Sequence, residues 1–306
     1  MLIYIEDKEL QTKVITYLDY IKKNYTLNFN DTYDTVLIAQ INKNTKEIIK
    51  NKKVIFITYL EEEKIYKNFI KNNKKSRSYK IRIMSILKKC NLIITSIEGI
   101  KNILLKEGNL KIEVIPKEIP VINISKNNKE VYERYNISKR KKKIIVLDKE
   151  YNNLESLDFI VNKYPKYQFI YVGFIPDYKL TKKEKNILHN LSSSVIKIKY
   201  IDLNIFSDLL KITDIVISFD DLLLDIEYFY TLVILKKQLI CKDTVLYKPN
   251  YINSKNIYLF KDIKDLDLKF GRMVNHRISN LTDETYEEIK NNTFQYIVKK
   301  YSIYLH

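Results

Sequence analysis

A group of four carboxylates close to one apolar run could do chemistry in this chain. The group follows the apolar run DIVISF (214–219) and consists of Asp220, Asp221, Asp225 and Glu227. The run reads as a buried strand, and a helical stretch follows at 223–236. The acids either line a ligand-binding loop or stay in solvent and complement the positive end of the helix dipole. The residues alone leave both interpretations open.

Other patterns that carry chemistry are missing from the sequence. No Cys/His cluster has metal-ligand spacing, no Gly-rich loop ends in Lys and Ser or Thr, and no dinucleotide fingerprint follows a strand. We therefore expect no metal centre, ATPase or dehydrogenase. The histidines His189, His276 and His306 stand apart and are interpreted as surface residues. Gly173 follows the run QFIYV, where a backbone either approaches a ligand or simply turns.

The composition favours a folded, basic protein of two domains. The 306 residues allow two domains of about 150 residues each. Lys and Arg number 54 against 37 acids, a net charge of +17, which indicates either a polyanionic partner or the codon usage of an A/T-rich genome. The two cysteines, Cys90 and Cys241, suggest a reducing compartment. No run reaches about 18 apolar residues, so we expect a cytoplasmic protein with any membrane contact peripheral.

Short β-branched runs alternate with longer amphipathic stretches, which predicts βαβ units and parallel sheets. The runs of the first half are 2–5, 35–40, 53–59, 91–96 and 112–116, and those of the second half are 142–148, 168–174, 195–201, 214–219, 238–241 and 256–260. Helical stretches near 153–163, 204–212 and 223–236 fill gaps in the second half.

The fold class that follows is α/β, with two Rossmann-like parallel-sheet domains facing a cleft. We expect them over 1–125 and 142–281, joined by a polar linker at 126–141. A C-terminal helix is predicted over 282–306, because Thr282 is a suitable N-cap and acids precede lysines along the stretch.

The order and spacing of several segments resemble family 4 glycosyltransferases. The segments are NLIITSIEGIKNILLKEGNLKIEVIPKEIP (91–120), KYPKYQFIYVGF (163–174) and VIKIKYIDLNIFSDLLKITDIVISF (195–219). The sequence is most similar to the bacterial diacylglycerol glycosyltransferases, which add a hexose to a membrane glycolipid, and this likeness extends through KDTVLYKPNYI (242–252). The resemblance covers roughly residues 50 to 300. It implies the GT-B fold, a UDP-hexose donor, retaining transfer and no bound metal or cofactor.

The chain departs from the family pattern at the positions that bind the donor. The two Glu positions fall on Leu223 and Thr231, and the Arg and Lys that neutralise the donor diphosphate fall on Asp148 and on Asn153 or Leu154. Lys149 is the cation that stands nearby. In the first domain the family His corresponds to Thr58, and the glycine-rich turn after the first strand is absent from IYIEDKELQTKV.

These departures leave two hypotheses. In the first, the chain transfers a hexose to a glycolipid or other glycan acceptor, with a rebuilt donor site. Its candidate residues are Asp148, Lys149, Asn153, Gly173, Asp220, Asp225, Glu227 and Thr231. In the second, the chain is an inactive pseudo-glycosyltransferase that scaffolds or stabilises an active transferase subunit.

A basic amphipathic stretch at 69–90 predicts an anionic membrane surface as a partner. Its cations are Lys71, Lys74, Lys75, Arg77, Lys80, Arg82, Lys88 and Lys89. The alternative is a helix that packs its Ile and Leu face on the domain sheet, and both can hold together. The run KRKKK (139–143) is interpreted as a solvated linker, and the scattered tyrosines argue against nucleic-acid binding.

Overall fold

The chain divides into two units, each with its own parallel sheet. A computed structural model describes residues 1–28, 30–70, 74–119, 128–148, 153–172, 181–191, 195–198, 203–221, 226–244, 246, 257–275, 291 and 293–305. Unit 1 comprises Met1–Glu118 together with Asn292–His306, and unit 2 comprises Ile119–Asn291.

Unit 1 is built on a five-stranded parallel sheet with the strand order β1-β2-β3-β4-β5. Its strands are β1 (Leu2–Tyr4), β2 (Thr35–Ile38), β3 (Lys53–Ile57), β4 (Leu92–Thr95) and β5 (Ile112–Val114). A parallel bridge joins Leu2 to Thr26, and the Ile3 N–H donates to the Thr26 carbonyl at 3.0 Å. Since neighbouring residues of a strand direct their hydrogen bonds to opposite sides, β1 lies between Thr26 and β2. The chain therefore reverses its direction across the sheet at β1, which is a topological switch point.

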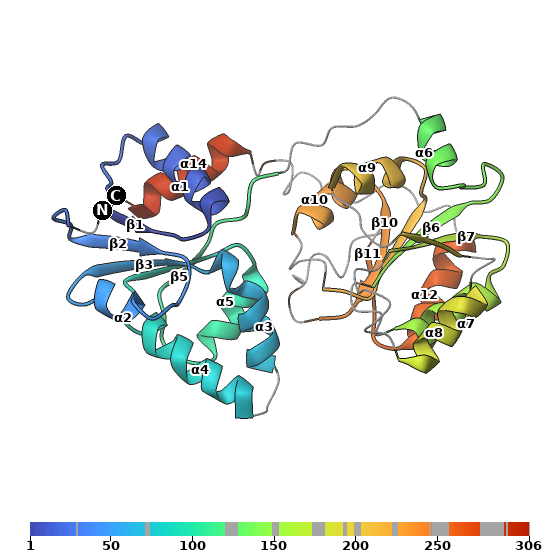
Figure 1. Ribbon diagram of the computed structural model, residues 1–306, viewed down its shortest axis with the longest axis horizontal. Coiled ribbons are helices and arrows are strands. Elements are labelled where there is room, and N and C mark those ends of the chain that lie inside the picture. Colours follow the sequence, from blue (N-terminus) through green and yellow to red (C-terminus); the bar gives the residue numbers. More distant parts are fainter. Residues whose placement is uncertain are drawn as a thin grey trace. The chain divides into compact units, whose positions relative to one another are not determined.

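Helices cover both faces of this sheet. They are α1 (Lys8–Tyr20), α2 (Thr45–Ile48), α3 (Glu62–Ile70), α4 (Lys74–Leu87), α5 (Glu98–Leu105) and α14 (Phe294–Leu305), with a 3₁₀ turn η1 at Thr58–Leu60. α1 and α14 lie on one face and the helices α2 to α5 on the other (Figure 1). Because both faces are covered, the strands are nearly continuous runs of Ile, Val and Leu.

The C-terminal helix α14 is a structural part of unit 1. Tyr301 of α14 is 1% exposed and stacks on Tyr17 of α1, with ring centroids 5.2 Å apart. Ile297 and Val298 join the same core, which reaches the strands through residues such as Ile3. Burial raises the pKa of Tyr301 to about 12, so its hydroxyl stays protonated in the core.

Unit 2 contains a six-stranded parallel sheet with the strand order β11-β10-β9-β6-β7-β8. Its strands are β6 (Lys143–Leu147), β7 (Gln168–Val172), β8 (Val195–Ile198), β9 (Ile215–Ser218), β10 (Gln238–Lys242) and β11 (Ile257–Phe260). Counted within the unit, this is the doubly wound order 6-5-4-1-2-3. Its switch point lies between β6 and β9, which pair in parallel with Ile145 opposite Val216.

Helices also cover both faces of the second sheet. They are α6 (Asn128–Arg134), α7 (Leu154–Lys163), α8 (Lys182–Asn190), α9 (Leu203–Lys211), α10 (Ile226–Ile234) and α12 (Ile263–Asn275). α7, α8 and α12 contribute to one core with the strands, centred on Ile144, Phe169 and Phe270. α9 and α10 lie on the opposite face (Figure 1). The loops of unit 2 therefore gather at the two ends of its strands.

The predicted fold class, α/β with two parallel-sheet units and a C-terminal helix, is confirmed. The predicted helix at 282–306 is described from Phe294 to Leu305, and its start at Thr282 lies outside the described residues. The stretch predicted as a linker, 126–141, contains α6, which contacts α9 of unit 2.

Replacing Tyr301 by Ala should destabilise unit 1 by about 3 kcal/mol or more, because a large buried ring is lost from between α14 and α1. Ile303 lies on the same helix and is 60% exposed, so Ile303→Ala should change the free energy of unfolding by about 0.5 kcal/mol or less. Urea unfolding of the two variants measures the difference. Equal losses would show that α14 is not packed as described.

Candidate functional site

The carboxyl ends of β6 and β9 form the switch point of unit 2, where ligands of doubly wound folds bind. Asp148 follows β6 and is 1% exposed. Its carboxylate accepts hydrogen bonds from the backbone N–H of Asn153 at 3.0 Å, from the Asn153 side-chain amide at 3.2 Å and from the Tyr171 hydroxyl at 3.0 Å. Asp148 and Asn153, which are both among the predicted donor-site candidates, thus contact each other, and the carboxylate holds the start of α7 against β7.

The residues after β9 form a tight polar turn. The Ser218 hydroxyl donates to the Asp220 carbonyl at 3.1 Å, and the Asp220 N–H donates to the Ser218 oxygen at 3.2 Å. Asp220 is half-buried there. This turn lies beside Asp148, because Leu147 and Ser218 are partners across β6 and β9.

Two further candidates lie on α10. Glu227 is exposed in the first turn of the helix, where its charge complements the helix dipole. Thr231 is fully buried, and its hydroxyl donates to the Glu227 carbonyl at 2.8 Å within the helix. The Thr231 hydroxyl is therefore occupied by its own helix.

Several predicted residues lie outside the described part of the chain. They are Lys71, Lys149, Gly173, Leu223, Asp225, His276 and His306. His189 lies exposed in the last turn of α8, as its interpretation as a surface residue requires.

The described carboxyl ends of β6, β9 and β10 carry mostly acids. These residues are Asp148, Asp220, Asp221 and Asp243, against the single described cation Lys242. A diphosphate brought to this edge would be repelled by the carboxylates and would need cations from elsewhere. The edge is suited to neutral, hydroxyl-bearing groups or to no ligand at all.

A buried carboxylate that the residue patterns did not predict lies at the carboxyl ends of β3 and β4 in unit 1. Glu62 is 3% exposed and accepts hydrogen bonds from the hydroxyls of Thr95 at 2.7 Å and Thr58 at 3.2 Å. Ser96 donates both its N–H and its hydroxyl to Glu62, each at 2.6 Å. Thr58, which stands where the family has His, is thus a support for Glu62. The available signal was the acid four residues after Thr58, at the step from strand to helix.

A second polar group lies at the switch point of unit 1. The Asn42 side-chain amide donates to the Tyr4 hydroxyl and to the Glu6 carboxylate. Gln40 has a buried side-chain amide with no hydrogen-bond partner among the described residues. The segment after β1 contains Asp7 in place of a glycine-rich turn. The Asp7 carboxylate accepts a hydrogen bond from the Leu10 N–H at 2.8 Å and caps α1.

The predicted basic stretch, 69–90, contains the whole of α4 and the last two residues of α3. Ile83, Met84, Ile86 and Leu87 of α4 are buried, so this face packs within unit 1. Ile81 is 66% exposed. The cations Lys74, Lys75, Arg77, Arg82, Lys88 and Lys89 are exposed, and Lys80 reaches Glu107 at 3.5 Å.

Comparison with known proteins gives the fold. No family model and no curated protein matches the sequence. Sucrose-phosphate synthase from Thermosynechococcus elongatus matches the structure with a TM-score of 0.66 at 10% identity, over 98% of this chain and 79% of that one. WaaG, a glycosyltransferase involved in lipopolysaccharide biosynthesis, matches with a TM-score of 0.58 at 10% identity, over 90% and 91%. The chain has the GT-B fold.

Further structures share this fold. The Glycosylation Associate Protein (Gap123) complex from Streptococcus agalactiae matches with a TM-score of 0.54 at 14% identity, over 96% of this chain and 58% of that one. Other matches were solved with UDP or UDP-GlcNAc. Identities of this size show the fold alone and leave the activity to the residues of the site.

Metal-binding clusters and membrane-spanning helices are both absent from the described residues. No group of three or more His, Cys, Asp or Glu side chains there is arranged to hold a metal ion. No helix in the described ranges has the length and apolar character needed to cross a bilayer.

Asp148→Ala should lower the free energy of unfolding of unit 2 by about 2–3 kcal/mol, because it removes the acceptor for the buried Tyr171 hydroxyl and for Asn153. Asp158 on α7 accepts one hydrogen bond from Asn162 in a more exposed place, so Asp158→Ala is the matched control and should cost much less. Chemical unfolding measures both. A stability unchanged by Asp148→Ala would refute the supporting role of this carboxylate.

Proposed function

We propose that this chain acts in glycan assembly as a glycosyltransferase-like protein without donor turnover, serving as the scaffold or stabilising subunit of an active transferase. The proposal rests on the burial of the Asp148 carboxylate at the switch point of unit 2. At the switch point where a diphosphate needs positive charge, the chain has a buried carboxylate whose described hydrogen bonds all serve the protein itself.

The neighbouring residues support the same function. The Thr231 hydroxyl is bound to its own helix and the Thr58 hydroxyl to Glu62, so neither replaces the family's donor-binding or acid-base group. Leu223 has no polar atom in its side chain with which to hold a sugar hydroxyl. A structure described as a Glycosylation Associate Protein complex shares the fold of this chain.

The second candidate function is hexosyl transfer from a UDP-hexose to a glycolipid or other glycan acceptor. The specific observation in its favour is the turn at Asp220, which lies beside Asp148 at the switch point and could bind sugar hydroxyls with Asp225 and Glu227. Lys149 would then supply the charge for the diphosphate. WaaG, which shares the GT-B fold, is a glycosyltransferase involved in lipopolysaccharide biosynthesis.

Calorimetric titration of the purified chain with UDP-glucose, UDP-galactose and UDP separates the two functions. The scaffold proposal predicts no saturable binding even at millimolar ligand. Micromolar binding that weakens about tenfold or more in both Lys149→Ala and Asp225→Ala would contradict it and would establish a rebuilt donor site. Isolation of the chain from its native cells adds an independent check, because a scaffold should co-purify with an active transferase and a chain recovered alone would not be one.

We also propose that the protein works at an anionic membrane surface through α4. The exposed Ile81 stands among exposed cations of this helix, an arrangement that binds anionic bilayers by inserting an apolar side chain between basic contacts. Each cation near such a surface contributes about 1 kcal/mol. The α4 surface is defined by Lys74, Lys75, Arg77, Ile81 and Arg82.

Reversing two charges of the α4 surface, in the double variant Lys74→Glu and Arg77→Glu, should weaken binding to vesicles containing phosphatidylglycerol by more than about tenfold. Vesicle co-sedimentation measures this, with vesicles of pure phosphatidylcholine as the uncharged reference. The double variant Lys182→Glu and Lys185→Glu makes the same charge change on exposed α8 of unit 2 and should have little effect. An equal loss of vesicle binding in the two double variants would show that net charge alone determines binding, and it would refute a specific role of the α4 surface.

A further inference from the structure

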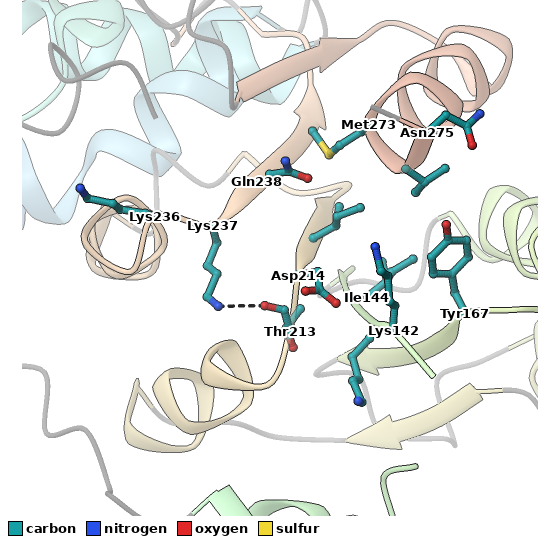
Figure 2. Close-up of a pocket in the computed structure, with 13 residues that line it drawn as sticks. Lys142, Ile144, Tyr167, Thr213, Asp214, Lys236, Lys237, Gln238, Met273 and Asn275 are labelled. Carbon is teal, nitrogen blue, oxygen red and sulfur yellow. Dashed lines mark hydrogen bonds between the residues drawn. The ribbon is translucent and has the colours of Figure 1, made fainter. Parts of the chain in front are cut away.

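Lysines line a cavity of about 570 Å³ at the amino ends of β6, β9 and β10 in unit 2. Figure 2 shows Lys236 pointing away from this cavity, while the Lys237 ammonium donates to the Thr213 carbonyl at 2.9 Å. Lys143, the last residue of the run KRKKK, is 6% exposed, so this residue does not belong to a solvated linker. The described lysines do not converge on one point, and the cavity defines no site for a single ligand.

Unit 1 anchors both connections between the two units. The chain passes from unit 1 to unit 2 after Glu118 and returns before Asn292. The first passage begins with the segment 115–118, which follows β5, and the second passage leads into α14. The contacts of these two places within unit 1 decide whether the connections behave separately or together.

Tyr17 of α1 contacts both passages. Its hydroxyl donates to the carboxylate of Glu118, the last residue of unit 1 before the first passage, at 3.3 Å. The centre of its ring lies 5.6 Å from that of Phe294, the first residue of α14, and 5.2 Å from that of Tyr301. Tyr17 is 6% exposed, so these contacts lie within the core of unit 1. One buried side chain therefore connects α14 to the segment 115–118.

A second link between the same two places passes through Tyr59, in the 3₁₀ turn after β3. The Tyr301 hydroxyl donates to the Tyr59 hydroxyl at 3.4 Å, and the Tyr59 hydroxyl donates to the Ile115 carbonyl at 2.6 Å. The Lys117 ammonium lies 5.7 Å from the centre of the Tyr59 ring. Tyr17, Tyr59 and Tyr301 thus form a tyrosine cluster that joins α14 to the segment 115–118.

The hydroxyls of the tyrosine cluster depend on one another for hydrogen-bond partners. Burial, and then the nearby Glu118, raises the pKa of Tyr17 above its ordinary value. Burial likewise raises the pKa of Tyr59, so both hydroxyls stay protonated and act as donors. A buried hydroxyl that loses its partner costs free energy. The cluster is therefore most stable when α14 and the segment 115–118 are both in place.

From these contacts we propose that α14 and the segment 115–118 open and close together, as one local folding unit held by the tyrosine cluster. Terminal elements open at a lower free energy than the central strands of a sheet. When α14 leaves its place, Tyr17 and Tyr59 lose contacts, and the segment 115–118 is held less firmly. One event then loosens both connections to unit 2. This coupling does not depend on the function proposed above.

Hydrogen exchange of the full chain, measured by mass spectrometry, tests the coupling. Phe294→Ala removes the ring of α14 that packs on Tyr17, and it should speed exchange about tenfold both in α14 and in the peptide 111–119. The Ile115 amide is the reporter in that peptide, because it donates to the Thr95 carbonyl at 2.9 Å. The amides of β3 are the internal reference, and their exchange should not change.

The double variant Tyr17→Phe and Tyr59→Phe removes both hydroxyl links and keeps the aromatic rings. In this background Phe294→Ala should still speed exchange in α14, but it should add nothing to the exchange of the peptide 111–119. Ile303→Ala changes an exposed residue of α14 and is the matched control. It should leave the exchange of both segments unchanged.

Three results would overturn the proposal. In the first, Phe294→Ala speeds exchange in α14 and leaves the peptide 111–119 as it was, so the two places open separately. In the second, the added exchange in this peptide is the same with and without the two hydroxyls, so the coupling does not pass through the tyrosine cluster. In the third, β3 exchanges faster by the same factor, which is a general loss of stability of unit 1.

Discussion

Unit 2 alternates parallel strands with helices that run in the opposite direction. This alternation determines which sign of charge each edge of the sheet can hold at a low cost in stability. Helices that run antiparallel to the strands begin near the carboxyl ends of the strands, with a partial positive charge, and end near the amino ends, with a partial negative charge. Acids such as Asp148 and Glu227 lie at the first edge, and lysines such as Lys142 and Lys237 lie at the second. The charges of the side chains therefore complement the helix dipoles at both edges.

A donor site in a nucleotide-sugar transferase opposes this arrangement, since it places cations where helices begin. Such a site sacrifices stability for catalysis, and a functional site is where a protein departs from the rules that its fold otherwise obeys. At the described carboxyl edge of unit 2 this chain follows the rules. Asp148 is connected to Asn153 and Tyr171 and contributes to stability. The described part of this edge contributes to stability, and that contribution is the physical basis of the scaffold proposal.

The sequence predicted the strands well and the placement of polar residues poorly. Each of the eleven described strands overlaps a predicted β-branched run, because a strand covered on both faces must be apolar along its length. Glu62 was not predicted to be buried, because an acid at the start of a helix is usually exposed. Thr95 and Ser96 donate hydrogen bonds to it only because β3 and β4 are paired. The gathering of lysines at the amino ends of β6 and β10 was not predicted, for a similar reason. Lys143 and Lys237 are 94 positions apart in the numbering, and their place at the same edge of the sheet depends on a strand order that residue patterns do not give.

The position of α14 in unit 1 affects how the chain folds during its synthesis. Residues of unit 1 occupy both ends of the described sequence, while unit 2 is continuous between them. During synthesis from the N-terminus, unit 2 has all its strands before α14 exists, so the face of α1 that carries Tyr17 waits uncovered. A segment with exposed apolar surface for that long is a target for chaperones and a risk for aggregation. Among the described elements α14 is the last to be synthesised, so unit 1 gains its final helix only after the strands of unit 2 have been made.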